Sequence, residues 1–214
     1  MKILIVDDHV IFRAGLRQLL LQELVNPVIE EAGDGISALY KLPEKKWDVI
    51  LLDINLPDKN GIEILKNIKQ KKPEQPVLML SMYSEEQYAV RALRAGAAAY
   101  LTKETSPDEL VDAIKQVASG RKYISHSLAH TMATHIQEIE FGDKPHMSLS
   151  DREYDIFARL ASGKTVSQIA EQLVLSVKTV STYRTRVLKK MKLQNNAELM
   201  QYAVINQIYV DTQI

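Results

Sequence analysis

The chain has 214 residues, of which 46% are hydrophobic and 25% charged, and its 27 basic side chains balance 27 acidic ones. Such values are typical of a soluble globular protein with one large domain or two small ones, and the absence of cysteine excludes a disulfide scaffold and thiolate metal sites. No apolar run reaches the roughly 18–20 residues of a membrane span, so we expect a cytoplasmic protein that does not associate with membranes.

The first 122 residues alternate short apolar runs with amphipathic segments of helical length. The apolar runs predict strands at 2–7, 27–32, 48–53, 76–81 and 98–102. Helices are predicted between and after them, near 10–23, 35–42, 60–70, 84–95 and 106–119. This alternation is typical of an α/β fold in which right-handed crossovers build a doubly wound, five-stranded parallel sheet.

Polar residues follow four of these strands at the point where each strand ends. They are Asp7 and Asp8, then Asp53, Ser81 and Lys103. Ligands of such sheets bind at the carboxyl ends of the strands, and in the common order 2-1-3-4-5 the first and third strands are neighbours. Clustered carboxylates repel one another unless a cation offsets their charge, and oxygen ligands are typical of magnesium. The pattern therefore predicts a site for Mg²⁺ and a phosphoryl group, with Asp53 as the nucleophile.

Residues 123–147 differ in character and are interpreted as a linker. Apolar residues at near-helical spacing predict a short amphipathic helix, and 141–146 is expected to be a loop. These apolar residues are Leu128, Met132, Ile136 and Ile139. Histidines at 126, 130 and 135 invite a metal hypothesis, but no nearby carboxylate completes a site, so a solvated connector helix is favoured.

Residues 148–214 contain no predicted strand. A capping box at Ser150–Glu153 opens a first helix, a second lies near 166–173, Ser176 caps a third that ends near Met191, and a fourth spans 196–205. Two short helices joined by a tight turn match a helix-turn-helix. The third helix is expected to turn these apolar residues inward: Val177, Val180, Val187, Leu188 and Met191.

A basic stripe runs along this third helix. Between 178 and 192 there are six basic residues and no acidic one: Lys178, Arg184, Arg186, Lys189, Lys190 and Lys192. Such a stripe is suited to a polyanion, although a solvated helix face accounts for the charge alone equally well.

These motifs together resemble the two-component response regulators of the NarL/FixJ family, with a receiver domain at 1–122 and a LuxR-type helix-turn-helix domain at 148–214. The resemblance is carried by Asp7-Asp8, Asp53 with Leu56-Pro57 and Gly61, Ser81, Ala95-Gly96-Ala97 and Lys103, and by Leu149–Glu153, Ile169-Ala170 and Lys178-Thr179-Val180. Two positions depart from the usual pattern, because Glu104 and Val10 stand where relatives often have proline.

The resemblance implies that Asp53 accepts a phosphoryl group from a sensor histidine kinase. Mg²⁺ would be held by Asp8, Asp53 and the main-chain carbonyl of Asn55, with Asp7 acting through water. Ser81 and Lys103 would bind the transferred group, and Tyr100 would rotate inward as Ser81 moves. Tyr83, two residues beyond Ser81, stands at a position that tunes phosphoryl lifetime in the family, and its bulk suggests a long-lived phosphoryl form. The chain would be no enzyme beyond slow self-dephosphorylation.

The same resemblance implies that the third helix reads the major groove of promoter DNA, with the protein a homodimer when phosphorylated. The residues expected to contact DNA are Lys178, Thr179, Ser181, Thr182, Tyr183, Thr185, Arg186 and Lys189. Arg184 is a further candidate for a phosphate contact. Phosphate contacts give affinity without sequence choice, and dimers of such modules bind two half-sites.

Three other functions compete with this interpretation. A magnesium-dependent hydrolase could use Asp53 on an external substrate, although no second acid or base is evident beside it. A flavodoxin-like FMN domain is disfavoured because the acidic end of the first strand would repel a phosphate. The helical domain could instead dock a protein, and a DNA-binding constant insensitive to salt would count against the DNA interpretation.

Overall fold

The computed structural model describes residues 1–43, 46–129, 145–206 and 208. The chain divides into two compact units, Met1–His130 and Thr131–Ile214. The sheet belongs to the first unit, and the elements described in the second are helical. Among these described residues, no helix has both the length and the apolar character needed to cross a membrane.

The sheet has five strands in the order β2-β1-β3-β4-β5, and each neighbouring pair is parallel. The strands are β1 Lys2–Val6, β2 Val28–Ala32, β3 Val49–Leu52, β4 Val77–Ser81 and β5 Ala99–Thr102. This confirms the doubly wound sheet and its order, and each predicted strand agrees with the observed one within about a residue. Because Val6 pairs with Leu52, the two strands end side by side at the same edge.

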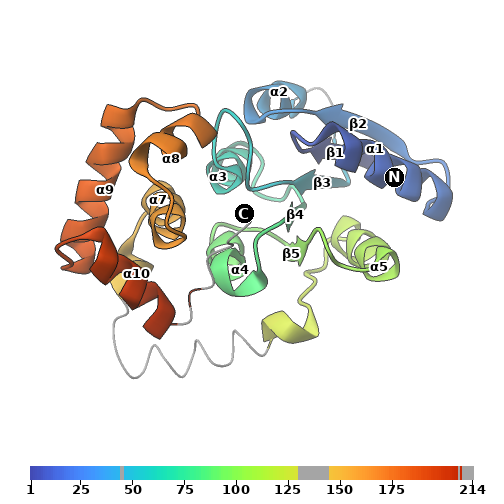
Figure 1. Ribbon diagram of the computed structural model, residues 1–214. Coiled ribbons are helices and arrows are strands. Elements are labelled where there is room, and N and C mark those ends of the chain that lie inside the picture. Colours follow the sequence, from blue (N-terminus) through green and yellow to red (C-terminus); the bar gives the residue numbers. More distant parts are fainter. Residues whose placement is uncertain (44–45, 130–144, 207, 209–214) are drawn as a thin grey trace. The chain divides into compact units, whose positions relative to one another are not determined.

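Helices cover both faces of this sheet, with α1 and α5 on one face and α2, α3 and α4 on the other (Figure 1). Their bounds are α1 Val10–Glu23, α2 Gly35–Lys41, α3 Gly61–Lys71, α4 Glu85–Arg94 and α5 Pro107–Ala118. Burial of both faces explains why the strands are continuous apolar runs rather than alternating ones. The core under α1 and α5 includes Ile3, Ile5, Leu16, Leu20, Leu51, Leu101 and Ile114.

The turn from β3 into α3 requires glycine at position 61. A Cβ atom on Gly61 would lie 2.0 Å from the carbonyl oxygen of Asp53 and 2.7 Å from the Cα of Ile54. Asn60 caps the helix, since its side chain accepts a hydrogen bond from the N–H of Ile62 at 2.9 Å. This close approach of the backbone fixes the segment directly behind Asp53.

The predicted linker is described only in part. Leu128 is wholly buried and His126 is exposed, whereas Met132, Ile136, Ile139 and the histidines at 130 and 135 lie outside the described residues. The predicted loop at 141–146 was wrong at its end, because Pro145–Ser148 forms a 3₁₀ turn, η1. His146 in this turn is buried and lies 2.8 Å from the hydroxyl of Tyr202, a distant contact that no local pattern indicates.

The second unit holds four α-helices among its described residues: α7 Asp151–Ala161, α8 Val166–Gln172, α9 Val177–Met191 and α10 Asn196–Ile205. The four predicted helices are therefore confirmed, as is the capping box of Ser150 with Glu153. A second capping box, Thr165 with Gln168, opens α8. One orientation was wrong, because Val177 is 51% exposed. As the first residue of α9 it lies at the rim of the packed face, whereas the other four residues expected inside are buried.

Candidate functional site

Two aspartates and a lysine meet at the carboxyl edge of the sheet. Asp7 follows β1 and Asp53 follows β3, and each is only 2% exposed. The N–H of Asp53 donates to the carbonyl of Val6 at 2.9 Å, which extends the pairing of the two strands to the aspartates themselves. Lys103, after β5, places its Nζ 2.6 Å from Asp7 Oδ2 and 2.8 Å from Asp53 Oδ2. One buried ammonium therefore bridges two buried carboxylates.

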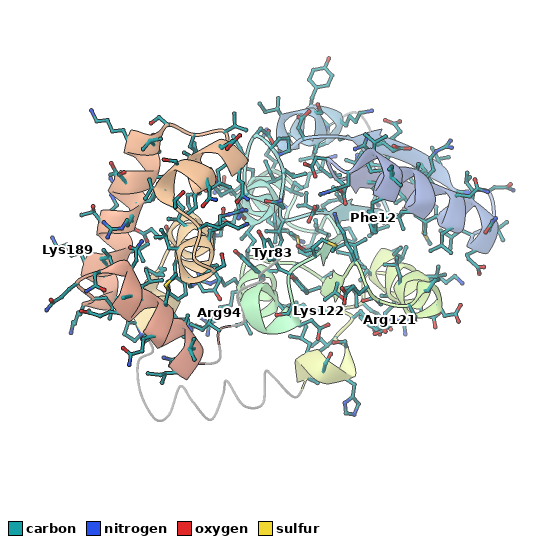
Figure 2. All side chains as sticks on the ribbon, in the orientation of Figure 1. Phe12, Tyr83, Arg94, Arg121, Lys122 and Lys189 are labelled. Carbon is teal, nitrogen blue, oxygen red and sulfur yellow. The ribbon has the colours of Figure 1, made fainter. Side chains whose placement is uncertain are left out.

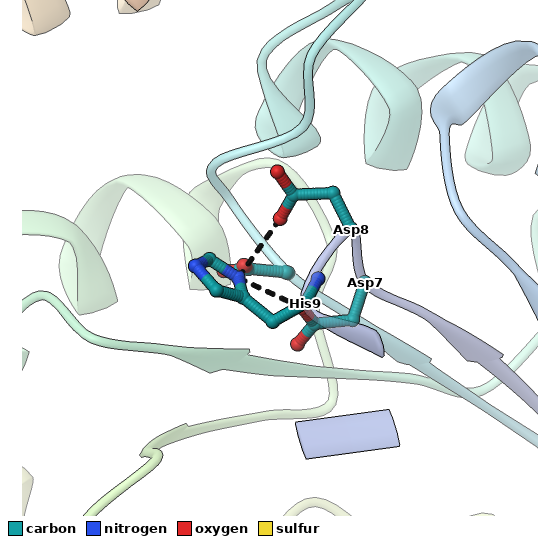
Figure 3. Close-up of side chains that lie close together, drawn as sticks. Asp7, Asp8 and His9 are labelled. Carbon is teal, nitrogen blue, oxygen red and sulfur yellow. Dashed lines mark hydrogen bonds and ion pairs between the residues drawn. The ribbon is translucent and has the colours of Figure 1, made fainter. Parts of the chain in front are cut away.

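Asp8 and His9 extend this cluster toward solvent (Figure 3). The His9 Nδ1 lies 2.9 Å from Asp8 Oδ1 and 3.2 Å from Asp7 Oδ1. Ligand atoms of Asp7, Asp8, His9 and Asp53 all lie within 4.8 Å of one another. Asp53 Oδ1 is buried without a hydrogen-bond partner among the described residues. A compact, oxygen-rich set with a free buried carboxylate oxygen fits a divalent cation such as Mg²⁺.

Burial raises the pKa of Asp53 above its ordinary value, and the negative charge of Asp7 adds to the rise. The Lys103 ammonium opposes it, as does the backbone of Asn55, although no hydrogen bond of normal geometry reaches Oδ1. Lys103 itself lies 4.7 Å from the centroid of the Phe12 ring, which covers the ammonium. The net effect is a raised pKa of Asp53, because burial outweighs the attraction of the neighbouring Lys103 ammonium.

Ser81, Tyr83 and Tyr100 lie together beside these carboxylates. Ser81 ends β4 and is wholly buried, and the N–H of Tyr83 donates to its Oγ at 3.4 Å. Tyr100, on β5, is also wholly buried and donates its hydroxyl to the carbonyl of Tyr83 at 2.7 Å. Burial holds the pKa of Tyr100 well above 10, so the phenol stays a hydrogen-bond donor. The aromatic side chain therefore points inward in this structure.

The remaining predicted ligand, Asn55, lies in the loop between β3 and α3, where it forms an isolated bridge with Asn60. Sequence reasoning did not assign a role to three other residues of this region. His9 had one signal, its place directly after the aspartate pair, whereas Phe12 is found only through its contact with Lys103. Asp58 caps α2 from the β3–α3 loop, since its two oxygens accept from the N–H groups of Gly35 and Ile36, both at 2.8 Å.

The outer face of α9 presents the residues expected to contact DNA. Val180, Val187, Leu188 and Met191 pack inward, so the helix turns its polar side outward. Thr179 and Tyr183 are partly exposed, and the exposed members are Lys178, Ser181, Thr182, Thr185, Arg186 and Lys189 (Figure 2 labels Lys189). The threonine hydroxyls at 182 and 185 donate to the carbonyls of Lys178 and Ser181, at 2.9 and 3.0 Å. An exposed polar helix after a short turn suits the major groove.

The basic stripe divides into exposed and structural members. Arg184 donates its Nε to Asn196 Oδ1 at 2.7 Å, and Lys190 places its Nζ 2.6 Å from Glu153 Oε2. Burial by itself would raise the pKa of Glu153, but the hydrogen bonds from Lys190 and Ser150 outweigh it and hold that pKa below its usual value. Arg184 and Lys190 therefore tie α9 to α10 and α7.

Comparisons with known proteins agree with both halves of this description. Residues 3–115 match the family "Response regulator receiver domain", and residues 147–203 match "Bacterial regulatory proteins, luxR family". The response regulator UvrY of Escherichia coli is 36% identical over 94% of this chain and 93% of its own length. The response regulator GacA of Pseudomonas aeruginosa is 35% identical over 95% of both chains.

Solved structures give the same result. A complex of the two-component response regulator RcsB with DNA has a TM-score of 0.58 and 27% identity, and the match covers 95% of this chain and 98% of that one. RcsB from Salmonella enterica serovar Typhimurium, bound to the promoter P1flhDC in the presence of the phosphomimetic BeF3⁻, has a TM-score of 0.59 and 26% identity over 94% and 97% of the two chains. The chain therefore belongs to the NarL/FixJ family of two-component response regulators, with a receiver domain and a LuxR-type DNA-binding domain.

Proposed function

We propose that phosphorylation of Asp53 by a sensor histidine kinase, in the presence of Mg²⁺, switches the promoter binding of this regulator. The observation that carries the proposal is Asp53 Oδ1, a buried carboxylate oxygen with no hydrogen-bond partner among the described residues. The other oxygen of the same carboxylate is held by Lys103, so one oxygen is oriented and the other is available. An oriented but unpartnered carboxylate is suited to nucleophilic attack.

The transfer is a displacement at phosphorus. Asp53 Oδ1 attacks the phosphorus of a phosphohistidine, a phosphorus–oxygen bond forms, and the phosphorus–nitrogen bond breaks with its electron pair going to the imidazole. Lys103, already 2.8 Å from Asp53, neutralises a phosphoryl oxygen as a point charge. Ser81 donates its hydroxyl to another oxygen of the transferred group.

Asp7, Asp8, Asp53 and the carbonyl of Asn55 would hold the Mg²⁺, with Asp7 acting through water. The ion supplies charge neutralisation for the phosphoryl oxygens. Asp7 is occupied on one side, since its Oδ2 lies 2.6 Å from the Lys103 ammonium. A water-mediated role for Asp7 is consistent with this pairing.

Labelling with acetyl phosphate tests the proposal. Wild type with Mg²⁺ should take up one phosphoryl group per chain, and Asp53→Asn or chelation of Mg²⁺ should abolish uptake. Asp108→Ala, at an exposed aspartate in the first turn of α5, is the control and should label normally. Undiminished labelling of Asp53→Asn would overturn the assignment. Many turnovers of a small phosphate ester per chain would instead support a hydrolase.

We further propose that 1–122 is the receiver, 123–147 the linker and 148–214 the DNA-binding domain. The division between His130 and Thr131 falls inside this linker, and the family matches end at 115 and resume at 147. The phosphorylated protein would bind two promoter half-sites as a homodimer, through the outer face of α9, in the cytoplasm. The RcsB complexes with promoter DNA support this by likeness.

Promoter binding followed by salt titration, with sizing of the phosphorylated protein, tests this second part. DNA affinity should fall steeply as salt rises, because each neutralised phosphate releases counterions. Affinity independent of salt, or a phosphorylated protein that stays monomeric on DNA, would contradict it.

A further inference from the structure

The start of the linker is fastened to the first unit by side chains that the phosphoacceptor site does not use. The N–H of Tyr123 donates to the carbonyl of Ala98 at 3.0 Å, and its hydroxyl donates to Glu109 Oε1 at 2.9 Å. Gln116 donates its Nε2 to the carbonyl of Lys122 at 2.6 Å. Figure 2 labels Lys122 at this point of the chain. Residues 122 and 123 are thereby held against α5 and the residue that precedes β5.

The next attachment depends on one carboxylate, that of Glu85. The hydroxyl of Ser125 donates to Glu85 Oε1 at 2.7 Å, and that of Ser127 donates to Oε2 at 2.5 Å. The two hydroxyl oxygens are 3.0 Å apart. Ser125 Oγ also accepts from the N–H of Leu128 at 3.1 Å, and Leu128 is wholly buried. We name this group of Glu85, Ser125 and Ser127 the linker clasp.

Glu85 is the first residue of α4, and only four positions separate it from Ser81. The loop between them includes Tyr83, whose carbonyl accepts a hydrogen bond from the buried Tyr100 hydroxyl at 2.7 Å. The N-cap of α4, Ser84, makes no side-chain cap, and its Oγ is buried without a partner among the described residues. An unused cap leaves the first turn of α4 weakly fixed, which favours movement of this loop as a unit.

We propose that phosphorylation of Asp53 opens the linker clasp; this rests on the function proposed above. When Ser81 Oγ turns to donate to the phosphoryl group, it leaves the N–H of Tyr83, to which it is now joined at 3.4 Å. The loop shifts, Glu85 is carried with it, and its carboxylate no longer reaches both serine hydroxyls. The helical turn at 126–129 then loses its attachment to α4, and the linker gains freedom to reposition the DNA-binding domain.

Hydrogen exchange of the full chain, followed by mass spectrometry, tests the clasp. The amides of residues 123–129 should exchange about tenfold faster after treatment with acetyl phosphate and Mg²⁺, the effect of losing roughly one hydrogen bond. Glu85→Ala should exchange fast with or without the phosphodonor, and Asp53→Asn should stay slow with it. Unchanged or slower exchange at 123–129 in protein whose Asp53 is labelled would overturn the clasp. Absence of labelling would instead count against the proposed function.

Three further variants separate the clasp from general destabilisation. Ser125→Ala shortens a buried side chain without adding volume, so the fold should be retained while the hydrogen bonds to Glu85 and to the N–H of Leu128 are lost. Ser125→Ala should reproduce the fast amide exchange that Glu85→Ala shows at residues 123–129. Glu85→Gln, which keeps one side-chain oxygen, should exchange more slowly there than Glu85→Ala. Glu63→Ala, at a glutamate in the first turn of α3, is the matched control and should leave 123–129 slow. Slow exchange in Ser125→Ala would contradict the proposal.

Discussion

The carboxyl edge of the sheet and the outer face of α9 both gather charged side chains, but at different depths. Asp7 and Asp53 are each 2% exposed, and their environment is supplied by three strands and Lys103. Lys178 and Lys189 lie on the surface of one helix. Buried charges depend strongly on their partners, whereas exposed charges are screened by water and salt. Substitutions at the sheet edge should therefore change stability, and those on α9 should change DNA binding.

The largest effect is expected from Lys103→Met, which removes the cation shared by two buried carboxylates. The free energy of unfolding should fall by roughly 3–5 kcal/mol, and millimolar Mg²⁺ should restore more of it than in the wild type. Urea unfolding with and without Mg²⁺ measures both effects. Lys115→Met, at an exposed position of α5, is the control. If the free energy of unfolding fell no more in Lys103→Met than in the control, the two carboxylates would be better solvated than the structure indicates.

Gly61→Ala should be the next most damaging change. The new methyl group would lie 2.0 Å from the Asp53 carbonyl oxygen, so backbone rather than a flexible side chain must move. We expect a loss of about 1–3 kcal/mol, with reduced labelling of Asp53. Gly15→Ala is a matched control, since nothing lies within 4 Å of its Cβ position in α1, and it should gain about 0.5–1 kcal/mol. Equal stabilities of the two variants would contradict the close approach of the Asp53 carbonyl oxygen to the Gly61 backbone.

Asp53→Asn should stabilise the protein by about 1–3 kcal/mol at neutral pH, because it removes a buried charge with an unpartnered oxygen. Burial raises the pKa of Asp53, so the native state binds more protons than the unfolded chain. Wild-type stability should thus fall as pH rises from the unfolded value of about 3.9 through the raised pKa. The gain in the variant should vanish below that window. Thermal unfolding across pH measures this, and a gain that persists in acid would count against it.

The smallest effects are expected from substitutions of two adjacent lysines of α9, Lys189 and Lys190, which should differ in their consequences. Lys190→Ala should destabilise the second unit by about 1 kcal/mol, because Glu153 loses its 2.6 Å partner while Lys190 is half-exposed. Since the pKa of Glu153 is lowered, the stabilisation from the Lys190–Glu153 pair is present at neutral pH and is lost as pH falls through that pKa.

Lys189→Ala is the matched control and should leave stability unchanged while the salt dependence of DNA binding weakens by about one phosphate contact. Unfolding curves and salt titrations of both variants are needed. If Lys189→Ala lowered stability and Lys190→Ala weakened the salt dependence of DNA binding instead, the assignment of exposed and structural members of the basic stripe would be wrong.

The sequence by itself determined the local elements of this protein and the chemistry at the strand ends. Continuous apolar runs predicted the five strands, and caps such as Ser150 and Ser176 predicted where helices begin. Asp7, Asp53 and Lys103 could be predicted to converge because strands of a parallel sheet end at one edge. Periodicity and capping act between neighbours in the chain, so a single sequence reveals them.

Only the tertiary structure decided which charged groups are paired and which stay available. Lys189 and Lys190 are indistinguishable in the stripe, yet only Lys190 reaches Glu153, 37 positions away in the chain. The cover of Lys103 by Phe12 and the attachment of Ser125 to Glu85 likewise join residues distant in sequence. Such contacts depend on how packed elements are placed in space, and no local period or propensity encodes that placement.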